Sequence, residues 1–76
     1  MKEKIFDILS GIKEDTDFSV SKSFFDDGLL TSIDIIMLVS ELSDAFEITI
    51  PASEIVPKNF NSIDSICEMI IRLIDD

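Results

Sequence analysis

Apolar residues recur at the spacing of one helix face in three separate segments, and this periodicity constrains the fold more than any other feature. The segments are residues 2–12, a stretch from Thr31 or Ser32 to about Phe46, and a last one that begins near Asn61 or Ser62. Each segment predicts an amphipathic helix with one buried face. The residues that share a face are Ile5, Ile8, Leu9 and Ile12 in the first segment, Ile35, Leu38, Val39, Leu42 and Phe46 in the second, and Ile63, Ile66, Cys67, Ile70 and Ile74 in the third.

The connections between the predicted helices differ in length. Residues 13–30 form a long first loop, whose apolar residues are expected to pack beneath it as a satellite of the core: Phe18, Val20, Phe24, Phe25, Leu29 and Leu30. Residues 47–51 are expected to be extended because Pro51 disfavours helix at Ile50. Ala52 to Val56 should form one short helical turn before Pro57. The sequence therefore predicts an all-α fold in a single domain over residues 1–76, a small four-helix bundle of three main helices and one short helix.

The second predicted helix has a defined start and an unusual outward face. Thr31 can cap it, and Asp34 three residues later completes a capping box with a shortened acid. Opposite the core face lie Ile33, Met37, Ser40 and Asp44, so two large apolar residues occupy a side expected to face water. We interpret Ile33 and Met37 as a contact surface for partner proteins.

The formal net charge of −10 is large for 76 residues, and its distribution along the chain is uneven. All six basic residues lie outside residues 23–57: Lys2, Lys4, Lys13, Lys22, Lys58 and Arg72. That stretch holds seven acids: Asp26, Asp27, Asp34, Glu41, Asp44, Glu47 and Glu54. We expect a purely acidic surface that meets basic protein surfaces and avoids nucleic acid and anionic membranes. A solvated face that only keeps the protein soluble is the alternative interpretation.

Few residues could support catalysis or bind a metal. The chain has no histidine and one cysteine, which excludes an internal disulfide, Ser-His and Cys-His pairs, and ordinary zinc or haem sites. Cys67 lies on a predicted core face and should be buried. Asp26 and Asp27 lack the spacing of a calcium loop, and there is no glycine-rich phosphate loop. We therefore expect no catalytic residues and no metal site. We also expect a monomer that resides in the cytoplasm and does not insert into membranes.

The segment from Phe24 to Asp34 places a hydroxyl, Ser32, in the first turn of a helix behind a glycine-containing loop. A phosphodiester at that position would meet free backbone N–H groups and the positive end of the helix dipole. In the sequence Gly28-Leu29-Leu30-Thr31-Ser32-Ile33-Asp34 the chain resembles the acyl carrier protein family, the phosphopantetheine-binding carrier domains. The resemblance extends to Phe46-Glu47-Ile48-Thr49-Ile50-Pro51, to Glu54-Ile55 and to Phe60-Asn61-Ser62-Ile63, and so covers nearly the whole chain.

The resemblance implies a free-standing carrier with a 4'-phosphopantetheine arm on Ser32 that holds acyl or aminoacyl groups as thioesters. It implies a phosphopantetheinyl transferase as one partner, and loading and acyl-transfer enzymes with basic docking surfaces as others. The expected docking residues are Ile33, Asp34, Met37, Glu41, Asp44 and Glu47. Two positions depart from the family pattern. Thr31 replaces the usual aspartate, which removes a negative charge beside the serine, and Ile33 replaces leucine.

Two questions stay open at the level of the sequence. The first is whether the chain is a carrier or an acidic helical binding module, such as an immunity-protein-like inhibitor without a prosthetic group. The net charge fits both, whereas only a carrier explains the segment from Gly28 to Asp34. The second is the cargo, because fatty acid synthesis, polyketide or peptide assembly, and D-alanine transfer to cell-wall polymers all use carriers of this size. Thr31 and the Gly28-Leu29-Leu30 form of the motif favour a specialised pathway over the housekeeping fatty acid carrier.

Overall fold

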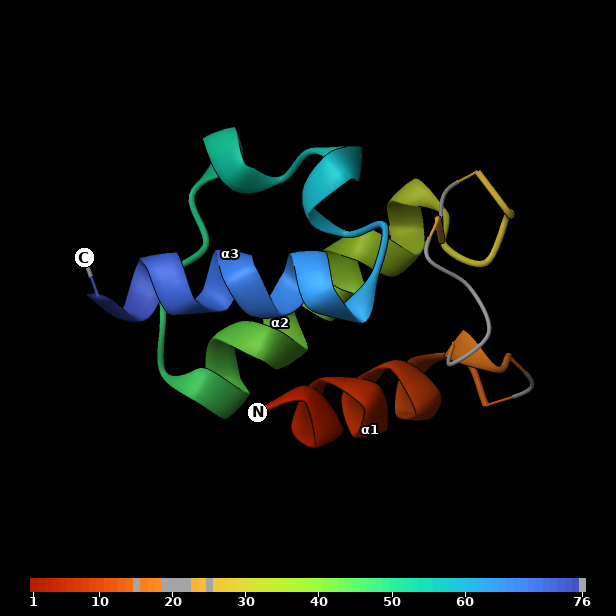
Figure 1. The fold of residues 1–76 in the computed structure, drawn as a ribbon, viewed down its shortest axis with the longest axis horizontal. Helices are drawn as coiled ribbons and strands as arrows, with labels where there is room; N and C mark the ends of the chain where they lie inside the picture. The colour runs from red at the N-terminus through yellow and green to blue at the C-terminus, as the bar shows by residue number, and fades with distance from the viewer. Residues whose placement is uncertain (15, 19–22, 25, 76) are drawn as a thin grey trace.

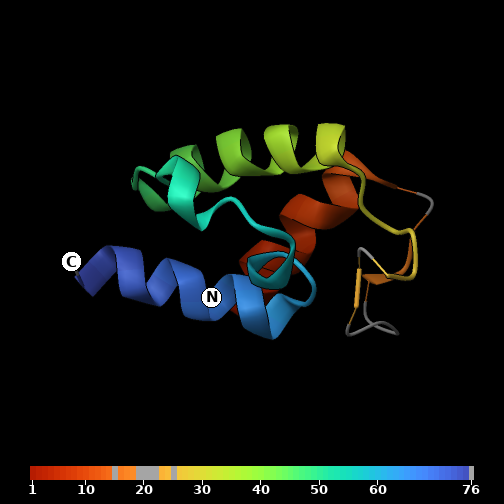
Figure 2. The same ribbon diagram turned by 90° about the horizontal axis from the view of Figure 1, so that it is seen from above.

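The computed structural model of the protein describes residues 1–14, 16–18, 23–24 and 26–75. Within these residues the chain forms three α-helices and two short 3₁₀ turns, with no strand, and the predicted all-α fold is confirmed (Figure 1). The elements are α1 (Lys2–Ile12), α2 (Ser32–Phe46), η2 (Ala52–Glu54), η3 (Pro57–Asn59) and α3 (Ile63–Asp75). Helix α1 contacts both α2 and α3. The η2–η3 connection leads from the end of α2 across to the start of α3 (Figure 2).

Helix α1 has the bounds that its apolar spacing predicts. Ile5 and Leu9, four residues apart, are fully buried, and Ile8 and Ile12 pack against the core from its edge. The helix ends at Ile12, and the backbone N–H of its C-cap residue Lys13 donates to the carbonyl of Leu9 at 2.9 Å. No helix in the described ranges is both long and apolar enough to cross a bilayer.

Helix α2 is buried along one face and capped at both ends. Ile35, Leu38 and Leu42 are buried, as the periodicity predicts. At the C-terminus Glu47 adopts a left-handed conformation with φ 53°, and the N–H of Ile48 donates to the Ser43 carbonyl at 3.1 Å. The last turn holds no basic residue, but Lys4 of α1 reaches it and donates from Nζ to the Ala45 carbonyl at 3.2 Å. This ammonium offsets the negative end of the helix dipole.

The connection after α2 differs from the single turn predicted over Ala52 to Val56. Turn η2 already ends at Glu54, and a second turn, η3, begins at Pro57. Proline disfavours helix at the preceding residue, and Val56 is accordingly extended with φ −131° and ψ 150°. Because its fixed φ suits a first helical position, Pro57 then starts the second turn. The Asn59 side chain ties the two turns together by donating to the Glu54 carbonyl at 2.7 Å.

Helix α3 begins after Ser62, whose Oγ accepts the N–H of Ser65 at 3.0 Å. Cys67 is buried, as predicted. The prediction for Ile74 was wrong, because its side chain is 49% exposed while Met69 is fully buried. The buried face is rotated toward Met69, and the last turn of α3 extends beyond the helices that could cover it (Figure 1, Figure 2).

The first long loop contributes to the main core. Phe18, Phe24 and Leu30 belong to the same buried cluster as the helix residues, so they are not the separate satellite that the sequence suggested. The rings of Phe18 and Phe24 meet edge to face, with centroids 5.0 Å apart. Backbone contacts fix the segment as well, since the N–H of Phe24 donates to the Asn61 carbonyl at 2.7 Å. Leu29 is half-buried, and Val20 and Phe25 lie outside the described residues.

Candidate functional site

The loop and the cap together place Ser32 at the surface. Gly28 turns the chain with φ +74°, a conformation that favours glycine, and the N–H groups of Leu29 and Leu30 then donate to the Phe24 carbonyl. Leu30 is buried and anchors the end of the loop. Thr31 is extended, and Ser32 follows as the first residue of α2 with its side chain exposed. The backbone N–H groups at this point have no partner within the helix, so they favour an anion.

The capping box at the start of α2 leaves Ser32 as the available hydroxyl. The Thr31 hydroxyl accepts the Asp34 N–H at 3.3 Å and donates to Asp34 Oδ2 at 3.0 Å. In return, Asp34 Oδ2 accepts the Thr31 N–H at 2.9 Å. The predicted capping box is therefore confirmed. The Thr31 hydroxyl already donates one hydrogen bond and accepts another. Ser32 therefore offers the accessible nucleophile at this end of the helix.

Asp34 is tied to α1 as well as to the cap. Lys13 Nζ lies 3.1 Å from Asp34 Oδ2, and the two side chains are 30% and 13% exposed. Partial burial alone would raise the pKa of Asp34. The Thr31 N–H, the Lys13 ammonium and the Thr31 hydroxyl outweigh that effect, so the pKa lies below its ordinary value. Asp34 is one of the predicted docking residues, but its carboxylate is turned into this network and is not a free surface charge.

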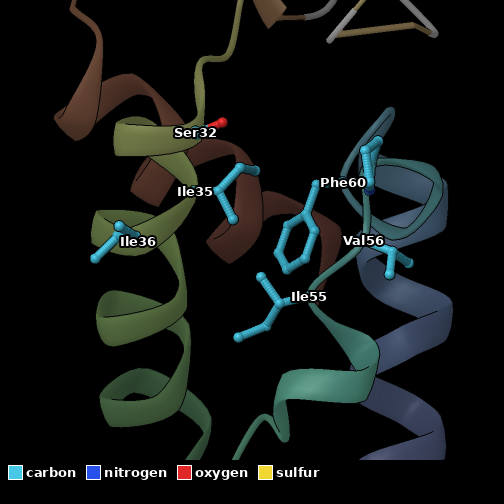
Figure 3. A pocket seen from close by; sticks show the side chains of 7 residues that line it. Ser32, Ile35, Ile36, Ile55, Val56 and Phe60 are labelled. Atoms are coloured by element: carbon cyan, nitrogen blue, oxygen red, sulfur yellow. The ribbon is translucent and has the colours of Figure 1, made fainter.

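An apolar groove of about 290 Å³ opens beside Ser32, between α2 and the η2–η3 connection (Figure 3). Ile35 of α2 and Ile55 and Phe60 of the connection point toward one another across it, with Ser32 at one end. Ile36 and Val56 lie at its edges. A flexible, mostly uncharged arm attached to Ser32 could lie against these side chains, because burying its carbon atoms is favourable.

Comparison with known proteins matches the chain to a family over most of its length. Residues 3–70 match the family described as phosphopantetheine attachment site. The D-alanyl carrier protein of Lactococcus lactis subsp. cremoris is 35% identical over 78 residues, covering 100% of this chain and 99% of that protein. This chain belongs to the phosphopantetheine-binding carrier proteins.

Two further relatives support the same family. The D-alanyl carrier protein of Streptococcus suis is 31% identical over 74 residues, covering 96% of this chain and 94% of that protein. Aminoacyl carrier protein 1 of Bradyrhizobium diazoefficiens is 32% identical over 75 residues, covering 93% of this chain and 82% of that protein. No solved structure gave a significant match. As a carrier protein the chain is not an enzyme, and its family carries covalently bound 4'-phosphopantetheine.

The start of α2 fits that prosthetic group. Ser32 supplies an exposed oxygen, the helix start supplies N–H groups for the phosphodiester, and the adjoining groove is apolar. Other serines of the carrier protein are placed differently. Ser43 donates its hydroxyl to the Val39 carbonyl at 2.7 Å, and Ser62 and Ser65 bond to each other at 3.0 Å. Ser40 is exposed but lies in the middle of α2, away from the free N–H groups.

The outward face of α2 is apolar next to Ser32 and acidic farther along. Ile33 is 71% and Met37 43% exposed, and Glu41, Asp44 and Glu47 are also exposed. The residues predicted for this face do not include Ile36, which is 70% exposed and also lines the groove beside Ser32. The signal was present in the sequence, since a rotation of about 100° per residue places Ile36 close to Ile33 on the helix surface.

The surface of the carrier protein is less uniformly acidic than the sequence suggested. Basic residues from distant positions pair with acids of the 23–57 stretch: Lys13 with Asp34 at 3.1 Å, and Arg72 with Glu54 at 2.6 Å. Lys4 covers the C-terminal end of α2 and lies 5.3 Å from the centre of the Phe46 ring. The prediction of a purely acidic surface was therefore wrong. The exposed acids along this face are Glu41 and Asp44 of α2 and Glu47 at its C-terminal cap, with the Lys4 ammonium nearby at the end of the helix.

Proposed function

We propose that this chain carries D-alanyl groups as thioesters on a 4'-phosphopantetheine arm attached to Ser32. The observation that carries the site assignment is the exposed Ser32 hydroxyl at a capped helix start beside an apolar groove. The cargo is suggested by the relatives named D-alanyl carrier protein, which align with nearly the whole chain. An aminoacyl carrier among the relatives points to the same class of cargo.

The residues of the chain act by holding and presenting the arm. On the transferase, Ser32 Oγ attacks the phosphorus atom that bears the arm in coenzyme A and gives its proton to a base of that enzyme. A new O–P bond forms, the P–O–P bond of the diphosphate breaks, and the adenosine nucleotide leaves with the second phosphate. The N–H groups at the start of α2 stabilise the resulting phosphodiester. When bound, the arm supplies a thiol, which the carrier needs because Cys67 is buried.

The groove accommodates the arm better than the cargo. Its walls are isoleucine, valine and phenylalanine side chains, whereas a D-alanyl thioester carries an ammonium group. Burying an unpaired charge against such walls is strongly unfavourable. The aminoacyl end therefore stays in solvent, where a second enzyme can take it up.

Partners reach the carrier through the outward face of α2. In this proposal the docking residues are all exposed: Ile33, Ile36, Met37, Glu41, Asp44 and Glu47. Asp34 is left out because its carboxylate pairs with Lys13 and accepts the Thr31 N–H. The acids steer a basic partner surface toward the helix, and the apolar residues supply the contact that is desolvated on binding. The partners are a phosphopantetheinyl transferase and the enzymes that load and unload the aminoacyl group.

Intact-mass measurement tests both parts of the proposal. Incubation with coenzyme A and a phosphopantetheinyl transferase should add one arm to the wild-type chain and to Ser40→Ala, and none to folded Ser32→Ala. Modification of Ser32→Ala would refute the site. Addition of ATP, D-alanine and the enzyme that loads the Lactococcus lactis carrier should then add one D-alanyl group, removable by hydroxylamine. A holo-protein that accepts malonyl groups from a fatty acid synthesis enzyme and not D-alanine would refute the cargo.

A further inference from the structure

A second groove, of about 470 Å³, lies between α1 and α2. Its apolar lining comes from both helices: Ile8 and Ile12 of α1, which are half-buried, and Met37 of α2, which is 43% exposed. Met37 also belongs to the outward face of α2, so the groove is continuous with the proposed docking residues. The groove beside Ser32 has a different lining and contains none of these residues.

Gly11 borders this groove. It lies in the last turn of α1 and lines the groove, and a Cβ added there would meet nothing within 4 Å. A glycine inside a helix costs roughly 0.5–1 kcal/mol relative to alanine. Its φ is not in the left-handed region, so no turn requires glycine here. The chain thus gives up helix stability at a position on the border of the groove, where a larger side chain would meet no clash.

The charges around the groove favour a cationic occupant. Asp7 of α1 and Glu41 of α2 line it, and both residues are exposed. Lys4 also lines it, but its ammonium is held at the end of α2 by the Ala45 carbonyl and the Phe46 ring. The groove therefore combines an apolar floor with carboxylates on two sides, which complements an apolar side chain flanked by lysine or arginine.

We propose that the α1–α2 groove receives an apolar side chain from a basic amphipathic helix of a partner enzyme, beside Gly11 and between Asp7 and Glu41. The inference rests on the proposed carrier function and extends the docking surface from α2 onto α1. Glutamine at position 11 would add a long side chain at the border of the groove, where it should hinder the occupant. Because glutamine is a better helix former than glycine, the fold should stay intact or become more stable.

The test uses Gly11→Gln, with Ala52→Gln as a control that adds a side chain of the same kind at an exposed position of η2. The probe is a synthetic amphipathic helix of leucine and lysine, titrated into the isotope-labelled protein and followed by NMR. Amide shifts should cluster at Ile8, Gly11, Ile12 and Met37. Affinity should fall roughly tenfold for Gly11→Gln and stay at the wild-type value for Ala52→Gln, as expected for loss of one well-packed interface contact. Glu41→Gln should also weaken binding and reduce its salt dependence.

Three results would overturn the inference. The first is that wild type and Gly11→Gln bind the peptide with equal affinity. The second is that the amide shifts spread over the acidic surface and do not cluster at the groove. The third is a set of groove shifts that depend on protein concentration without the peptide, which would identify a second copy as the occupant. The peptide titration can also be carried out on the chain that has no arm on Ser32. Absence of an arm at Ser32 in the mass assay therefore refutes the proposed function, while equal peptide affinities refute the groove alone.

Discussion

Replacing Asp34 with alanine measures what holds the start of α2 in place. The substitution removes the acceptor for the Thr31 N–H, the acceptor for the Thr31 hydroxyl and the partner of Lys13. A helix cap contributes about 0.5–2 kcal/mol, and an ion pair of partial exposure adds about 0.2–1 kcal/mol. We therefore expect Asp34→Ala to lower the free energy of unfolding by about 1–3 kcal/mol. Each kcal/mol should lower Tm by roughly 4–8 °C for a chain of this size.

Asp44→Ala is the matched control, because it removes the same charge from the same helix at an exposed position outside the cap. It should change the free energy of unfolding by no more than about 0.5 kcal/mol. Urea and thermal denaturation followed by circular dichroism measure both variants. Equal losses for Asp34→Ala and Asp44→Ala would refute the argument, because net charge and not the cap would then set the stability.

The pH dependence of the same pair gives a second check. The folded pKa of Asp34 lies below its ordinary value, so the stabilisation it provides is complete above the unfolded pKa of about 3.9 and is lost as the pH falls through the folded pKa. The difference between wild type and Asp34→Ala should be full at neutral pH and shrink on acidification. A difference that persists after the carboxylate is protonated would show that the contacts do not depend on its charge.

Three other predictions concern the core and the docking face. Leu42→Ala, at a fully buried position, should cost about 2–5 kcal/mol in denaturation, and an unchanged Tm would mean that the buried face of α2 is rotated. Met69→Ala should cost a similar amount and Ile74→Ala much less, and a reversed order would refute the assigned face of α3. In stopped-flow binding to a partner enzyme, Asp44→Lys should slow association and flatten its salt dependence, whereas Ile33→Ala should mainly speed dissociation. Unchanged dissociation of Ile33→Ala would place Ile33 outside the contact.

Local patterns were enough to predict the helices and the position of Ser32. The bounds of α1 follow from the spacing of Ile5 and Leu9, and the start of α2 follows from Thr31 and Asp34 three residues apart. These features depend on residues within about one helical turn of each other, so the local sequence is sufficient to predict them. The family motif, whose sequence ends at the same helix start, could be recognised for the same reason.

Contacts between distant residues were decided only by the tertiary structure. Lys13 reaches Asp34, and Lys4 reaches Ala45, because α1 packs against α2. No local sequence pattern predicts the angle at which two helices cross. The α1–α2 groove beside Gly11 exists for the same reason. The exposure of Ile74 likewise depends on where the neighbouring elements end, although its spacing matches that of buried residues. Periodicity specifies which side of a helix is apolar, whereas packing decides how much of that side is covered and which charges meet.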